Sequence, residues 1–192
     1  MSSRTPAARG VLAILLLFAA LDGRARTRAG EWRSYGHDPG GSRYSPLNQI
    51  TRDNVARLAP AWIYRHGEPV PAPGREGPAF ESTPLMIGDL LYFTSPRGRV
   101  IALDAESGAE RWTFDPQVKA PQESPRHRGV AYWEAGDDRR IFVGTHDGRL
   151  IALDASTGKP KASFGDDGQI QLDAALSLPR SATTGRFSSM PR

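Results

Sequence analysis

The sequence has no cysteine in its 192 residues, and this absence excludes several classes of protein. A thiol nucleophile, a disulfide framework and a thiolate-bound metal are all ruled out. A bacterial lipid anchor is ruled out too, because such an anchor is attached to a cysteine that follows the leader.

Also absent is an apolar run long enough to cross a membrane. Residues 11–21 (VLAILLLFAAL) are unbroken apolar sequence but fall short of the roughly 20 residues that a spanning helix needs. Arg4 and Arg9 precede this run, and the small residues Gly23 and Ala25 follow it at suitable cleavage positions. The pattern predicts a signal peptide over residues 1–25 and a periplasmic or secreted mature chain without a membrane span, with an uncleaved anchor as the alternative.

Clustered basic charge is missing as well, although the formal net charge is +4. The arginines are dispersed and no basic run alternates with aromatic residues, which argues against nucleic acid as a partner. Asp166 and Asp167 before Gly168 lack the spaced oxygen ligands of a calcium loop and indicate a turn. Metal-ligand spacing is absent from the histidines, which we expect at the surface or in packing: His37, His66, His127 and His146.

Glycine and proline, in contrast, are plentiful, with 20 and 16 copies spread singly among short apolar runs. This distribution favours turn-rich all-β structure. Residues 101–114 (IALDAESGAERWTF) and 151–164 (IALDASTGKPKASF) are two copies of one motif, fifty residues apart. In each copy an aspartate and a glycine mark a turn between two expected strands.

Each copy follows a further pair of expected strands, which makes about four strands in every fifty residues. Residues 84–95 should turn at Gly88 and Asp89, and residues 140–145 precede a turn at Asp147 and Gly148. A four-stranded unit repeated at this period is the blade of a β-propeller.

An earlier partial unit should end at residues 60–64 (PAWIY), where Trp62 takes the position of Trp112, whereas the second copy has Ala162 there. We interpret the two tryptophans as blade-to-blade packing residues, with a ligand-stacking role as the alternative.

The spacing of Ala102, Asp104, Gly108 and Trp112 resembles the tryptophan docking motif of eight-bladed dehydrogenases that use pyrroloquinoline quinone (PQQ). Residues 32–58 (WRSYGHDPGGSRYSPLNQITRDNVARL) are similar to the opening segment of that family. The segments FESTP and RGVAYW match it as well. The resemblance covers residues 31–170 and implies propeller blades, of which two to three are present.

The family resemblance implies PQQ beside a bound Ca²⁺, which polarises the quinone while an aspartate accepts the alcohol proton. Arg128 then corresponds to an arginine that contacts PQQ, and Glu81 to a glutamate at the same edge of the cofactor. Guanidinium groups suit the PQQ carboxylates because they donate parallel charge-assisted bonds. A solvated surface role is the alternative for both residues. The family's calcium ligands and catalytic aspartate are expected beyond residue 192, so no catalytic residue is assigned.

One departure bears on the substrate. Alcohol enzymes of the family carry adjacent cysteines before the Arg-Gly segment, where this chain has residues 123–127 (ESPRH). The chain therefore looks more similar to the glucose, polyol or quinate type, with a sugar or alcohol substrate and a quinone or cytochrome as electron acceptor.

Residues 187–191 (FSSMP) repeat the form of residues 80–84 (FESTP), so residues 171–192 are expected to begin a further blade or to form an irregular tail. We expect a truncated product that is inactive alone even with PQQ and Ca²⁺. The alternatives are a non-catalytic propeller that acts as a binding or assembly module, and an inactive remnant.

Overall fold

The computed structural model describes residues 30–38, 40–69, 72, 77, 79–118 and 126–172. The expected signal peptide at 1–25 lies outside these residues, as do residues 173–192 of the expected further blade or tail. Within the described part, no helix is long and apolar enough to cross a membrane.

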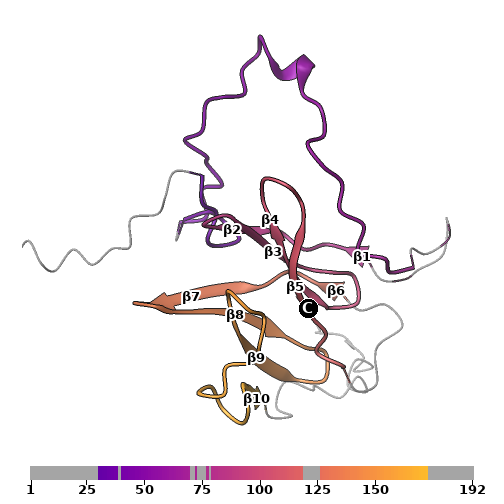
Figure 1. The fold of residues 1–192 in the computed structure, drawn as a ribbon, viewed down its shortest axis with the longest axis vertical. Helices are drawn as coiled ribbons and strands as arrows, with labels where there is room; N and C mark the ends of the chain where they lie inside the picture. Colours follow the sequence, from indigo (N-terminus) through magenta and orange to yellow (C-terminus); the bar gives the residue numbers. More distant parts are fainter. Residues whose placement is uncertain are drawn as a thin grey trace, which may run out of the picture.

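Two four-stranded antiparallel sheets make up the fold and pack face to face (Figure 1). The first has the order β2-β3-β4-β5, with strands β2 (Leu85–Ile87), β3 (Leu90–Thr94), β4 (Val100–Asp104) and β5 (Glu110–Phe114). The second contains β7 (Ala131–Ala135), β8 (Asp138–Gly144), β9 (Arg149–Asp154) and β10 (Gln169–Gln171), paired as β10-β9-β8-β7. These are two successive propeller blades, as the sequence predicts.

The remaining elements are short. Strands β1 (Ala79–Phe80) and β6 (Arg126–His127) pair in parallel just before the two sheets begin. A 3₁₀ turn, η1 (Val55–Arg57), lies on the segment 40–60, which loops away from both sheets in Figure 1.

The fifty-residue repeat is a structural repeat. Tyr92 pairs with Ala102 in the first sheet, and Phe142 pairs with Ala152 in the second, so β4 and β9 are equivalent strands. The expected two-residue turn between β2 and β3 is present at Gly88 and Asp89, because Ile87 pairs with Leu90.

The core forms where the alternating residues of one sheet meet those of the other. Its buried members are Leu85, Ile87, Tyr92, Val100, Ala102 and Trp112 from the first sheet and Ile141, Val143, Ile151, Leu153 and Ala155 from the second sheet and the turn that follows β9. The opposite face of the first sheet buries Phe93, Ile101 and Leu103 against the segment that carries Trp62 and Tyr64. Alternation along each strand sends neighbouring side chains to the two faces, so both faces of the first blade are apolar.

Two expectations about strands are wrong. Residues 60–64 form no strand, although Trp62 takes its predicted place. In the second repeat the chain pairs with β9 only at Pro160, then leaves the sheet as turns and returns as β10, where Gln169 pairs with Ile151. The backbone bonds on both sides of Pro160 are made, from Asp154 N to Lys159 O at 2.8 Å and from Lys161 N to Ala152 O at 2.9 Å, and the chain turns away after them.

The two tryptophans dock in the same way. Trp112 Nε1 donates to the carbonyl of Ala155 at 3.0 Å, and Trp62 Nε1 donates to that of Ala105 at 3.1 Å. The indole rings lie over Gly158 and Gly108, whose φ angles are both +70°. A side chain there would overlap the indole, so the motif requires glycine for close approach as well as for its backbone angle.

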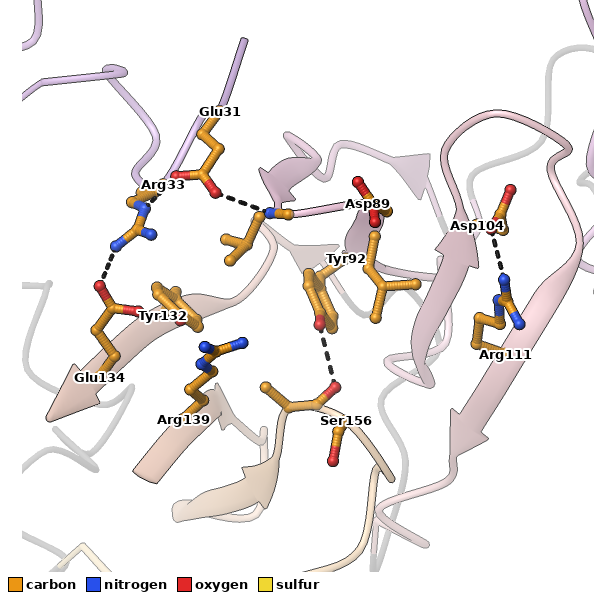
Figure 2. A pocket seen from close by; sticks show the side chains of 14 residues that line it. Glu31, Arg33, Asp89, Tyr92, Asp104, Arg111, Tyr132, Glu134, Arg139 and Ser156 are labelled. Carbon is orange, nitrogen blue, oxygen red and sulfur yellow. Dashed lines mark hydrogen bonds and ion pairs between the residues drawn. The ribbon is translucent and has the colours of Figure 1, made fainter. Parts of the chain in front are cut away.

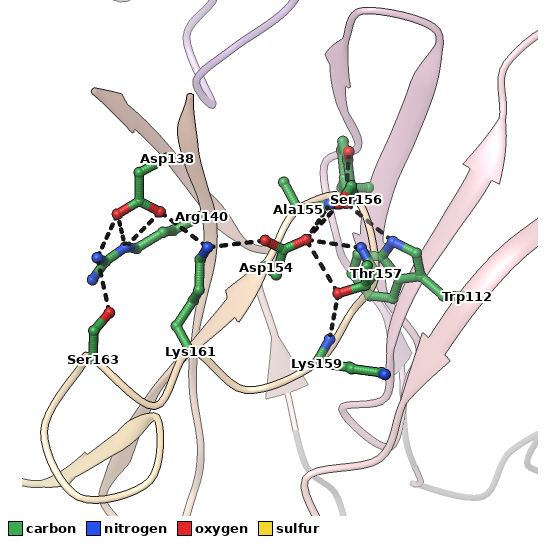
Figure 3. Close-up of polar contacts among 11 residues, drawn as sticks. Trp112, Asp138, Arg140, Asp154, Ala155, Ser156, Thr157, Lys159, Lys161 and Ser163 are labelled. Atoms are coloured by element: carbon green, nitrogen blue, oxygen red, sulfur yellow. Dashed lines mark hydrogen bonds and ion pairs between the residues drawn. The ribbon is translucent and has the colours of Figure 1, made fainter. Parts of the chain in front are cut away.

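The receiving turn of the second blade is held by a network of side chains (Figure 3). Asp154 accepts hydrogen bonds from the Ser156 and Thr157 amides, and Lys161 bridges Asp154 and Asp138. This turn presents the Ala155 carbonyl to Trp112, which confirms Trp112 as a blade-to-blade packing residue, while Trp62 packs its own segment on the first blade.

Candidate functional site

Glu81 and Arg128, the two expected cofactor residues, lie together between the blades. Arg128 Nη1 is 3.4 Å from Glu81 Oε2, although the residues come from different repeats. Glu81 follows β1 and Arg128 follows β6, so the parallel pairing of these strands carries both side chains to one place.

The backbone around this pair is closely packed. Thr83 N donates to the carbonyl of Arg128 at 3.4 Å, and the buried Ser82 hydroxyl accepts from Thr94 N at 3.0 Å. Gly129 has φ +118°, and a Cβ there would lie 3.1 Å from the Thr83 carbonyl oxygen and 3.2 Å from Ser82 Oγ. Glycine is therefore required after Arg128, because the backbone that follows β6 lies directly against Ser82 and Thr83.

The pair differs in exposure, and the difference indicates what it could bind. The Arg128 side chain is 79% exposed, whereas that of Glu81 is 25% exposed. Glu81 therefore lies deeper and holds one side of the guanidinium, while most of the Arg128 N–H donors face solvent. A planar anion with carboxylates is the ligand chemistry that such donors fit best.

Arg128 is the one cation of this pair, and its guanidinium has the chemistry to pair with a carboxylate of a ligand such as PQQ. For calcium the described residues offer no comparable set, since no three histidine or carboxylate groups there are placed to hold a metal ion. Asp166 and Asp167 lie in turns, as expected.

Beside this pair lies a feature that the spacing of the histidines did not indicate. The rings of His127 and His146 meet edge to face with their centroids 4.8 Å apart, and His127 is 7% exposed. Burial lowers the pKa of His127, and His146 lowers it further. We expected packing or surface histidines, and His127 is a packing residue.

A polar hollow of about 510 Å³ lies apart from this pair, at the β2–β3 hairpin (Figure 2). Arg33 bridges Glu31 and Glu134 there, and Tyr132 donates to Glu134 at 2.7 Å. Glu31 also accepts from Gly88 N, so the segment ahead of the first blade is tied to both sheets. No local sequence signal could reveal this contact, because Arg33 and Glu134 are far apart in the chain.

The fold and site define a class of protein. It is a propeller with docked tryptophans, and an arginine–glutamate pair follows the short strands β1 and β6 that precede its blades. Residues 32–192 match the family model described as PQQ, glucose/ethanol/alcohol dehydrogenase, β-propeller domain. The chain belongs to this family of PQQ-dependent dehydrogenases.

Relatives with different substrates are similarly close. The chain is 40% identical to quinoprotein glucose dehydrogenase of Escherichia coli over 161 residues, which covers 76% of this chain and 20% of that protein. It is 42% identical over 137 residues to 1-butanol dehydrogenase (cytochrome c) of Thauera butanivorans, covering 68% of this chain and 18% of that protein.

A solved structure agrees with the sequence matches. The quinohemoprotein alcohol dehydrogenase of Comamonas testosteroni is 34% identical, with a TM-score of 0.57 over 71% of this chain and 19% of that one. The chain thus spans about a fifth of the length of these relatives.

Proposed function

We propose that this chain supplies blades of a periplasmic or secreted PQQ-dependent dehydrogenase that oxidises a sugar, polyol or alcohol. The observation that supports this function is the meeting of Glu81 and Arg128 between two blades, at 3.4 Å. Periplasmic or secreted location rests on the leader pattern of residues 1–25.

In this proposal Arg128 binds a carboxylate of PQQ and Glu81 orients the guanidinium. PQQ, when bound, supplies the two-electron acceptor for the substrate. The chain's own residues contribute binding and orientation, because the exposed guanidinium can donate two parallel bonds while its other side faces Glu81. Calcium would bind through residues other than those described.

The substrate class rests on the missing cysteine pair, which favours a sugar, polyol or quinate-type substrate. Sequence identity does not separate the classes, since the glucose and 1-butanol enzymes are 40% and 42% identical to this chain. The electron acceptor is a quinone or a cytochrome; the name of the Thauera relative includes cytochrome c. For the whole enzyme, dye-linked oxidation of glucose, glycerol and 1-butanol with PQQ and Ca²⁺ would sort these substrates.

The cofactor role of Arg128 can be tested on this chain by titrating it with PQQ and following tryptophan fluorescence. Arg128→Ala should weaken binding by about tenfold or more, because a hydrogen bond to a charged group contributes about 1.5–3 kcal/mol. The PQQ affinity of Arg128→Lys should lie between those of the wild type and Arg128→Ala, since lysine keeps the charge and loses the planar fork.

Arg52→Ala is the matched control, because Arg52 is an exposed arginine on the segment that loops away from the sheets. Equal PQQ affinity in the Arg128→Ala and Arg52→Ala variants would show that Arg128 does not bind the cofactor.

A further inference from the structure

The His127 ring lies at the end of β6, just before Arg128, where β6 packs against both blades. Its ring contacts Gly98 in the turn 95–98 and His146 in the turn 145–148. Its Nε2 is buried and has no hydrogen-bond partner among the described residues.

The two turns are equivalent parts of successive blades. The turn 95–98 joins β3 to β4, and the turn 145–148 joins β8 to β9. Each is closed by a backbone bond, from Gly98 N to Ser95 O at 2.9 Å and from Gly148 N to Thr145 O at 3.0 Å. One imidazole thus packs against the equivalent turn of both blades, at Gly98 in the first and at His146 in the second.

Packing of this ring bears on the backbone of the candidate site. Phe80 and His127 are paired in the β1–β6 ladder, and Arg128 receives the Thr83 amide through its carbonyl. A shift of the ring away from Gly98 would therefore move β6 and with it the guanidinium that faces Glu81.

We propose that His127 is a positioning residue for the Glu81–Arg128 pair, and that acidification releases this pair by charging the buried imidazole. This inference rests on the proposed function, in which the pair binds PQQ.

The surroundings of the ring determine the sign of this dependence. Burial and His146 both lower the pKa of His127, whereas the Glu68 carboxylate raises it. Glu68 comes from the segment before β1; the turn 95–98 places Gly98 against the ring and leaves Arg97 exposed. The folded chain then holds fewer protons than the unfolded chain, so the packing loses stability as pH falls below about 6.5.

Amide hydrogen exchange of Thr83 provides a direct test, because its N–H donates to the carbonyl of Arg128. Between about pH 7.5 and about pH 5.5 its protection factor should fall, after correction for intrinsic exchange. Over this range the fall is limited to about tenfold, because only about one pH unit of it lies below the ordinary histidine pKa of about 6.5. The amide of Leu103 in β4 serves as the internal reference for the sheet.

Two variants distinguish a pH dependence caused by the His127 imidazole from a general loss of stability of the chain in acid. His127→Phe keeps a flat ring without a titrating group, so the pH dependence of the Thr83 amide should disappear. His146→Gln removes a group that lowers the pKa of His127, so the midpoint should move to higher pH. Unchanged pH dependence in His127→Phe, or protection in the wild type that does not depend on pH, would overturn the proposal.

PQQ titration at the same two pH values distinguishes failure of this inference from failure of the proposed function. The wild type should lose affinity on acidification by a larger factor than His127→Phe. If Arg128→Ala binds PQQ as well as the wild type does, the cofactor role fails, and the exchange experiment still decides whether His127 positions Arg128.

Discussion

The indole nitrogen of Trp112 and the hydroxyl of Tyr92 both donate to one acceptor, the backbone carbonyl of Ala155, at 3.0 Å and 3.1 Å. The two donors come from the first blade and the acceptor from the second. Burial raises the pKa of Tyr92 to about 12, so its hydroxyl remains a donor at any ordinary pH. This carbonyl therefore links the second blade to two side chains of the first.

Two substitutions of Trp112 should distinguish the contribution of its hydrogen bond to stability from the contribution of its packing. Trp112→Phe should lower the free energy of unfolding by about 1 kcal/mol, because Tyr92 still donates to Ala155. Trp112→Ala should cost about 3–5 kcal/mol, since this indole is only 9% exposed. Urea unfolding followed by circular dichroism measures both losses.

Trp133 is the control for these variants, being 45% exposed on β7. Trp133→Ala should cost well under half as much as Trp112→Ala. Similar losses at the two positions would contradict a specific docking role for Trp112.

Gly158→Ala should destabilise the chain more than Gly136→Ala. Both glycines have positive φ, +70° and +58°, so each alanine is strained by about 1–2 kcal/mol. At Gly158 the new Cβ would also lie 2.5 Å from Trp112 Cε3, whereas nothing lies within 4 Å of it at Gly136. The difference between the two free energies of unfolding measures the steric contact, and equal values would show that backbone angle alone selects glycine there.

Arg149 forms a second contact between the blades, which also recurs after fifty residues. Its Nη2 donates to Pro116 O at 2.8 Å and to Asp147 at 2.7 Å, and Arg99 donates to the carbonyl of His66 in the same way. Arg149→Met should cost about 3 kcal/mol, because it removes the cation of a largely buried pair.

The Arg111–Asp104 pair is the comparison for Arg149, because the Arg111 side chain is 58% exposed, and Arg111→Met should cost much less than Arg149→Met. Chemical unfolding of the two variants under one set of conditions gives the comparison. A loss at Arg149 no larger than that at Arg111 would show that the contact with Pro116 contributes little.

Glu68 should make the free energy of unfolding depend on pH in the acidic range. Burial raises its pKa, but hydrogen bonds from Ser95, Arg99 and the Arg97 amide outweigh burial and leave the pKa below the ordinary value of 4.5. The unfolded chain then binds the proton more readily, so this contribution is complete above about pH 4.5 and is lost as pH falls through the lower folded-state value.

Glu68→Gln should therefore be about 1–3 kcal/mol less stable at neutral pH, and its stability should fall less steeply than that of the wild type below about pH 4.5. Unfolding curves collected from about pH 3 to about pH 7 test this. Parallel curves for the two proteins would mean that Glu68 contributes no acid sensitivity.

The repeat, its turns and its docking residues could all be predicted from sequence because their signals are local. Gly88 and Asp89 mark a two-residue turn, and Trp112 lies at a fixed spacing from Gly108 in its own motif. The strand predicted over residues 159–164 pairs with β9 only around Pro160, and β10 takes the outer position of that sheet instead.

The candidate site was predictable only in part. Motif resemblance singled out Glu81 and Arg128, but their approach to 3.4 Å depends on the pairing of β1 with β6. The contact of His127 with His146 requires two turns from different blades to meet around one ring. Spacing along the chain cannot encode such contacts.

The sequence by itself therefore determined most of the strands, the fifty-residue period and the turns, since these depend on backbone preferences and on alternation over a few residues. Only the tertiary structure decided which side chains face one another between the blades. Packing one sheet on the next fixes the depth of Glu81, the exposure of Arg128 and the burial of His127 together. These are properties of two blades in contact, and neither repeat contains them alone.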